Sequence, residues 1–242
     1  MAVERLPSTG VPGRSADTWG CDTADVVMFH RFLRMMFADA ATIIGVVQDG
    51  DRRGTARAAR HLREIMHALH THHHGEDVVL WDALETRAPS CAVHVSQMRV
   101  QHEEIARLLA DLATELYRWQ RSARTEDASA VQTSLSALTV ALESHLTQEE
   151  IQILPAAEVS FTQREWGRLE RHGRSSVPPR WLFMQLGFML ASMPPTERAS
   201  FLRALPIPAR LLWSMIGRQS YTRRRRALFG TANSPSNGKS RP

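Results

Sequence analysis

Two short stretches of the sequence, His72-His73-His74-Gly75-Glu76 and His145-Leu146-Thr147-Gln148-Glu149, each place a glutamate four residues after a histidine. On an α-helix, residues four apart lie on the same face, so each stretch would hold an imidazole beside a carboxylate. Both groups are suitable ligands for iron. A histidine binds one metal ion, and a carboxylate one turn away can bridge to a second. Two such pairs on facing helices therefore predict a dinuclear metal site.

Both stretches lie within long segments whose apolar residues recur at alternating spacings of three and four. This spacing is typical of a helix with one face toward a core. Four such segments cover residues 25–48, 55–84, 92–120 and 127–154. Short polar connections between them favour antiparallel neighbours. The sequence therefore predicts an all-α fold, an up-down-up-down four-helix bundle followed by a C-terminal helical extension.

In each segment the apolar residues form a stripe along one face of the expected helix. Several polar side chains also occupy positions on these apolar stripes. They are His30, His72, Glu76, His102, His145 and Glu149. Burying an imidazole or a carboxylate without a partner costs on the order of several kcal/mol. A metal cluster shared by all four helices would compensate for that cost. Five other histidines of these helices and of the extension are expected at the surface or on a helix flank. They are His61, His67, His70, His74 and His172.

Taken together, these residues resemble the pattern of the hemerythrin, or HHE cation-binding, family over roughly residues 23–158. The resemblance rests on His30 and on the stretches HHHGEDVVLW, QMRVQHEEI and LESHLTQEEIQILP. It implies a bundle that holds two non-haem Fe ions, with a small ligand such as O2 at an open position. It also implies the ligand set: imidazoles from His30, His72, His73, His102 and His145, with Glu76 and Glu149 as bridges.

The spacing leaves two positions of this ligand set open. Asp77 competes with Glu76 because it follows His73 by the same four residues. Glu76 is preferred as the bridge because it continues the apolar stripe of its helix. His94 precedes His102 by eight residues, so it would join the site only if that helix bends.

A di-iron centre of this kind predicts a protein that binds or senses O2, NO or peroxide. One alternative is a catalase-like enzyme that decomposes peroxide, and another is a structural or interaction bundle stabilised by metal. The sequence does not separate a carrier or sensor from an enzyme. A ferritin-like centre is disfavoured because it needs two Glu-x-x-His motifs, and only Glu64 to His67 matches. No zinc-protease motif, Walker loop or dinucleotide-binding loop is present.

Charge and composition divide the chain into four regions. We expect a flexible arm over residues 1–22, the bundle over 23–158, a helical extension over 159–229 and a disordered tail over 230–242. Ten of the 30 basic residues follow Glu197, and no acidic residue does, so the preceding sequence holds 20 basic and 25 acidic residues.

The sequence of the C-terminal extension predicts contacts with the bundle and with other molecules. Its apolar helices predict packing against the bundle or a homodimer. Its basic end, from Tyr221 to Arg226 beside Trp213, predicts a weak membrane-surface contact at most. Nucleic acid is not an expected partner because no DNA-reading motif is present.

Helix start signals occur in the extension as well. Thr162-Gln163-Arg164-Glu165 is a capping box, which predicts a helix that begins there. Pro195 suits the first turn of a further helix.

The first twenty residues lack the apolar stretch of a signal peptide. The longest apolar run, 181–193, is shorter than the roughly 17–25 residues of a spanning helix. The two cysteines, Cys21 and Cys91, do not suggest a disulfide framework. These features predict a cytoplasmic protein.

Overall fold

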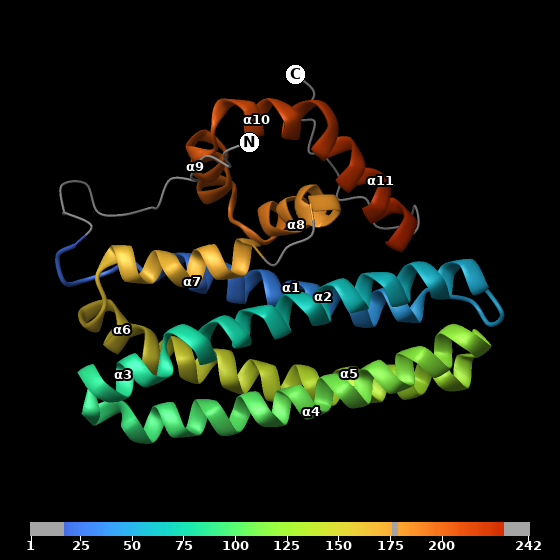
Figure 1. The fold of residues 1–242 in the computed structure, drawn as a ribbon. Coiled ribbons are helices and arrows are strands. Elements are labelled where there is room, and N and C mark those ends of the chain that lie inside the picture. Colours follow the sequence, from blue (N-terminus) through green and yellow to red (C-terminus); the bar gives the residue numbers. More distant parts are fainter. Residues whose placement is uncertain (1–16, 176–178, 230–242) are drawn as a thin grey trace.

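The computed structural model describes residues 17–175 and 179–229, and within these ranges the chain folds into helices without forming a β-sheet (Figure 1). Four long helices lie side by side and alternate in direction. They are α1 (Ala24–Gly45), α2 (Arg52–Val79), α4 (Ala92–Ser122) and α5 (Thr125–Gln148). The predicted all-α class and its up-down-up-down bundle are confirmed.

The loops at one end of the bundle are tied together by hydrogen bonds. The amide of Gly50, between α1 and α2, donates to the carbonyl of Ala123, between α4 and α5, at 2.8 Å. Asp49 accepts from the amide of Thr125 at 2.8 Å. Ala123 has a φ of 56°, which turns the chain sharply where α4 ends. Asp51 caps α2 by accepting from the amide of Gly54 at 2.9 Å.

Two of the predicted helices are interrupted toward the other end of the bundle. The segment expected over 55–84 ends as α2 at Val79 and resumes as α3 (Trp81–Arg87). The segment expected over 127–154 passes from α5 through a π-helical turn, η2 (Glu149–Ile153), into α6 (Leu154–Ser160). Pro155 lies in the first turn of α6 and supplies no amide N–H, so a regular α-helical ladder cannot run through it. The short helix η1 (Pro89–Cys91) leads from α3 into α4.

The core of the bundle consists of two apolar clusters that follow one another along its axis. Along the four helices, the change from the larger to the smaller cluster falls between Phe32 and Val26, Leu69 and Leu80, Ile105 and Met98, and Leu146 and Ile153. The polar stripe residues predicted from the sequence lie in these four intervals, except His145, which directly precedes Leu146. A layer of polar side chains therefore separates the two apolar clusters.

The chain continues through helices on one side of the bundle (Figure 1). They are α7 (Gln163–Ser175), α8 (Pro179–Ser192), α9 (Pro195–Ala204), α10 (Ile207–Leu212), the π-helical turn η3 (Trp213–Gly217) and α11 (Arg218–Phe229). The predicted capping box is confirmed, because Glu165 accepts from the amide of Thr162 at 3.0 Å and the amide of Glu165 donates to the hydroxyl of Thr162 at 3.2 Å. Pro195 occupies the predicted first turn of α9.

Helices α8 and α11 pack against α1 and α2 and extend the larger apolar cluster with Phe188, Leu228 and Phe229. An ion pair reinforces the contact, since the guanidinium of Arg224 lies 2.6 Å from the carboxylate of Glu64. His61 is buried in the same interface, with its ring centroid 5.2 Å from that of Phe188. Burial and the charge of Arg224 lower the pKa of His61 to about 3, so the ring is neutral.

Residues Gly20 to Asp22, which fall in the predicted arm, are attached to the bundle. The amide of Gly20 donates to the carbonyl of Phe161 at 2.9 Å, and that of Cys21 to Glu158 at 2.9 Å. Residues 1–16 and the predicted tail over 230–242 lie outside the described residues. Cys21 and Cys91 are both free thiols. No helix among the described residues has the length and apolar character required to cross a bilayer.

We predict that Gly187→Ala loosens the contact between α8 and α11. A Cβ at Gly187 would lie 2.5 Å from ring atoms of Tyr221 and 2.8 Å from its Cβ, so one of the two helices must move. Overpacking of this kind costs about 1–3 kcal/mol. The free energy of unfolding, measured in urea, should fall by about that amount.

Gly167→Ala on α7 is the matched control. Its Cβ would meet only the flexible end of Arg171, at 3.4 Å. Alanine is favoured over glycine within a helix by about 0.5–1 kcal/mol, so this variant should be as stable as the parent or more stable. Equal stability of the Gly187→Ala protein and the parent would contradict the packing described.

Candidate metal centre

The polar layer contains two groups of side chains whose ligand atoms converge. His73, Glu76, His102 and His145 form one group, in which one atom from each residue lies within 4.8 Å of all the others. His30, His72, Glu76 and Glu149 form the second, within the same limit. We call them the three-histidine group and the two-histidine group. Together they contain the seven residues that the sequence singled out, and Glu76 belongs to both.

Glu76 lies between the two groups and directs one carboxylate oxygen to each. Its Oε1 is 3.1 Å from Nε2 of His72, and its Oε2 is 3.6 Å from Nε2 of His102. The side chain has no exposed surface. Asp77, the competing candidate for the bridge, is 44% exposed at its side chain and lies outside both groups.

Glu149 belongs to the two-histidine group, but it also approaches the three-histidine group. Its Oε2 is 3.4 Å from Nε2 of His30 in the two-histidine group and 3.7 Å from Nε2 of His145 in the three-histidine group. Glu149 begins η2, one turn after His145 on α5. Both His-x-x-x-Glu pairs therefore place their glutamate between the groups.

The distances between ligand atoms suit a bound transition metal. Nitrogen and oxygen ligands bind such an ion at about 2.1 Å, so two ligands at right or tetrahedral angles lie about 2.8–3.6 Å apart. The Nε2 atoms of His30 and His72 are 3.0 Å apart, and the contacts of Glu76 with His72 and of Glu149 with His30 fall within the same range.

The chemistry of the layer also fits a cation. Among the described residues, several buried ligand atoms lack a hydrogen-bond partner. They are Nε2 of His73, His102 and His145 and both carboxylate oxygens of Glu76 and Glu149. Without a partner, each such atom costs free energy on burial. Metal ions bound in the two groups would provide partners for these atoms.

The pKa shifts in the layer have the directions expected of buried ligands without a cation. Burial, followed by the neighbouring imidazoles, holds the pKa of His72 and that of His73 well below the usual value and lowers that of His145 to about 2. Burial, followed by repulsion from Glu149, raises the pKa of Glu76 well above its usual value. Neutral imidazole is the form that binds metal, and a cation would restore the charge of the carboxylate.

Three of the histidines are oriented by hydrogen bonds from their outer ring nitrogen. Nδ1 of His102 donates to Asp77 at 2.7 Å, and Nδ1 of His145 donates to Gln101 at 3.1 Å. Nδ1 of His30 donates to Glu150 at 2.9 Å. With Nδ1 carrying the proton, Nε2 is left as the unprotonated atom that faces the layer. Such outer bonds fix the tautomer and the ring plane of a metal-binding histidine.

The acceptors of these bonds are themselves held in place. Asp77 also accepts from the indole of Trp81 at 2.7 Å, and Glu150 accepts from Arg34 at 2.7 Å. Although burial acts to raise it, the pKa of Asp77 is lowered, because His102 donates a hydrogen bond to it. The pKa of Glu150 is lowered in the same way by its bonds with His30 and Arg34, which outweigh its burial.

The sequence did not identify these outer partners, although a signal was present. Asp77 directly follows Glu76, Glu150 directly follows Glu149, and Gln101 precedes His102. A polar residue that directly precedes or follows a buried ligand in the sequence lies at the edge of the same layer. From there it can reach the imidazole of a neighbouring helix.

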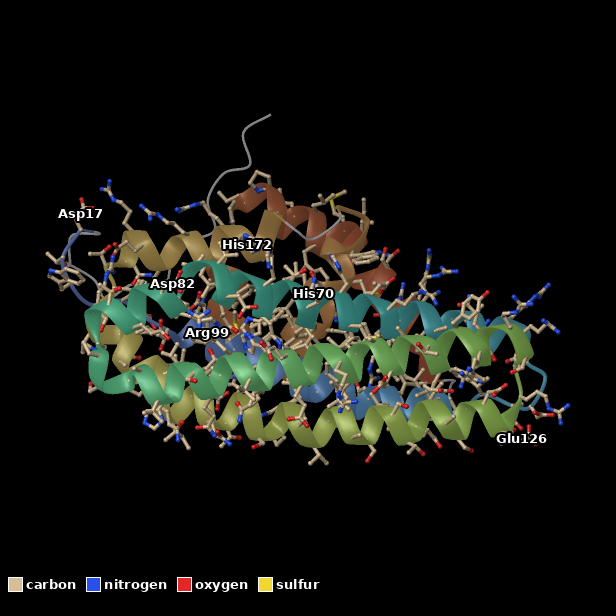
Figure 2. The ribbon with its side chains drawn as sticks, turned by 60° about the horizontal axis from the view of Figure 1, so that its bottom comes forward. Asp17, His70, Asp82, Arg99, Glu126 and His172 are labelled. Carbon is tan, nitrogen blue, oxygen red and sulfur yellow. The ribbon has the colours of Figure 1, made fainter. Side chains whose placement is uncertain are left out.

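The other histidines lie outside the two groups. His70 is exposed on α2, and His172 sits on α7, outside the four long helices (Figure 2). His61 was expected at the surface or on a helix flank, and it is buried between α2 and α8 rather than exposed. His94 is half-buried on α4 and belongs to neither group.

Comparison with known families agrees with this geometry. The family model described as the hemerythrin HHE cation-binding domain matches residues 22–157. Neither the curated proteins nor the solved structures contain a match to the chain. The matched segment covers more than half of the sequence and includes every residue of the two groups. The chain therefore belongs to the hemerythrin HHE cation-binding family, whose members bind metal ions, typically iron.

Proposed function

We propose that the polar layer holds two non-haem iron ions and that this centre binds O2, NO or peroxide. The observation that carries the proposal is the position of Glu76, whose two oxygens face different groups. A carboxylate placed in this way can bridge two metal ions, whereas a mononuclear site would need only one of the groups. Iron, when bound, would supply a redox-active position at which a small ligand coordinates.

Each residue has a definite role in this proposal. His73, His102 and His145 would bind one iron, and His30 and His72 the other, with Glu76 and Glu149 shared between them. The two-histidine group supplies one imidazole fewer, so we place the open position there. The ring of Phe29 lies 5.1 Å from that of His72, and such an apolar neighbour limits the access of water.

The charges of the site favour loading with a divalent metal. Burial lowers the pKa of His72, His73 and His145, so these imidazoles need not lose a proton to bind metal, and a bound cation would counter the rise in the pKa of Glu76. Asp77 and Glu150 keep their negative charge next to His102 and His30, which makes these imidazoles stronger donors to the metal.

The direct test is to measure iron content and visible absorption on protein purified with iron, reduced without oxygen and then exposed to O2, NO or peroxide. We expect about two irons per chain and absorption bands that change reversibly with O2 or NO. Rapid loss of peroxide with evolution of O2 would favour the catalase-like alternative instead. A single zinc ion per chain, or no metal, would contradict the proposal.

Glu76→Ala should abolish the dinuclear centre, because the variant removes an oxygen from each group at once. Iron content should fall from about two per chain to one or none. His70→Ala on the exposed side of the same helix is the control and should retain the full content. A Glu76→Ala protein that still holds two irons would show that another residue is the bridge.

Asp77→Asn should weaken iron binding without removing a ligand, because it takes away the negative charge that orients and polarises His102. Loss of such an outer partner typically lowers metal affinity 10–100-fold. We expect at least about a tenfold faster loss of iron to a chelator.

Asp82→Asn provides the same chemical change on α3 at an exposed site, where Asp82 pairs with Arg99 at 2.6 Å (Figure 2). Its rate of iron loss should equal that of the parent. Equal rates for all three proteins would argue against a role of Asp77 in the centre.

A further inference from the structure

Among the described residues, one short segment carries a cluster of exposed apolar side chains. Five large hydrophobic side chains between residues 207 and 216 are between 44% and 69% exposed. They are Ile207, Leu211, Leu212, Met215 and Ile216. Elsewhere among the described residues, no two such side chains lie within five residues of one another in the chain. We call these five residues, which lie on α10 and on η3, the α10 apolar face. An exposed apolar patch of this kind typically marks an interaction site.

The α10 apolar face points away from the rest of the protein. Trp213 and Gly217, on the same segment, are buried against the helices beneath it. Ile207, Leu211 and Met215 are spaced four residues apart, which places them along one side of a helix. Figure 1 shows α10 in the layer furthest from the four-helix bundle. A flat partner can therefore approach this face without meeting the bundle.

Positive charge surrounds the α10 apolar face. Arg210 and Arg218 lie within or next to it and are exposed, and Arg203, Arg223 and Arg226 are exposed on the adjoining helices. No acidic residue follows Glu197 in the sequence. Glu197 itself is paired with Arg31 of α1 at 2.7 Å. The partner of this face should therefore carry negative charge.

The arginine run that the sequence offered as a membrane contact is only partly available. Arg224 is paired with Glu64 of α2, and Arg225 stacks on the ring of Phe229 at 5.1 Å. Tyr221 is half-buried against Phe188, and Trp213 is buried. These residues attach α11 to the bundle, and the exposed apolar side chains lie on the preceding segment instead.

We propose that the α10 apolar face and its flanking arginines dock on an anionic lipid surface. Aliphatic side chains of an interfacial helix enter the boundary between headgroups and acyl chains, while arginines contact the phosphates. A second copy of the chain is a poorer partner, because two such faces would bring like charges together. Nucleic acid is also poorer, since its phosphate backbone offers nothing to five exposed aliphatic side chains.

The test is flotation of the full-length, iron-loaded protein with vesicles of neutral phosphatidylcholine or of phosphatidylcholine mixed with phosphatidylserine. We expect binding to the anionic vesicles only, and less binding as salt is raised. The double variant Leu211→Ser/Met215→Ser and the double variant Arg210→Gln/Arg218→Gln should each bind about tenfold less or weaker still.

Matched controls lie on α4. Val93→Ser/Val100→Ser changes two exposed apolar side chains, and Arg107→Gln/Arg118→Gln changes two exposed arginines. Both controls should bind vesicles as the parent does. All variants should keep the iron content and unfolding temperature of the parent, because the substituted side chains are exposed.

Other outcomes would overturn the proposal. One is the absence of binding to anionic vesicles at low salt, and another is equal binding by the face variants and the parent. A dimer that dissociates in Leu211→Ser/Met215→Ser without any vesicle binding would assign the face to a second copy. Binding of duplex DNA with the same dependence on the face, in place of vesicle binding, would assign it to nucleic acid.

Discussion

The desolvation of a layer of ionisable side chains in the middle of an apolar bundle is the constraint on which the rest of the structure depends. Seven histidines and glutamates lie between two apolar clusters, and many of their inward-facing atoms lack a protein partner among the described residues. Carboxylates and imidazoles buried in this way are unfavourable unless positive charge and ligand bonds compensate. The apolar clusters on both sides keep water out of the layer, so a metal ion would interact with its ligands at low dielectric.

Helical geometry distributes the ligand atoms between the two groups. His72 and His73 are consecutive on α2, yet they belong to different groups, because neighbouring residues on a helix point about 100° apart. Glu76, one turn further on, lies between them. Helix α1 contributes only to the two-histidine group and α4 only to the three-histidine group. The asymmetry between the groups therefore follows from which helices face each other across the layer.

Much of this arrangement could be predicted from the sequence, because periodicity reports which face of a helix is buried. The stripe positions of His30 and His102 predicted their burial, and the capping box at Thr162 predicted the start of α7. Periodicity does not report contacts between distant segments. The pairing of Arg224 with Glu64, 160 residues away, and the burial of His61 beneath α8 depend on how the last helices fold back.

Both helices that carry a His-x-x-x-Glu pair depart from regular α-geometry close after the glutamate. α2 ends three residues after Glu76, and η2 begins at Glu149. A π-helical turn holds one more residue than an α-helical turn, so it changes the rotational phase of everything that follows by about 100°. The rotation of α6 about its axis places Leu154 and Ala157 in the smaller cluster. This rotation is therefore set independently of the one that directs His145 and Glu149 into the polar layer. The helices on either side of the π-helical turn can thus pack against different neighbours. Sequence changes in α6 need not alter the orientation of His145 and Glu149.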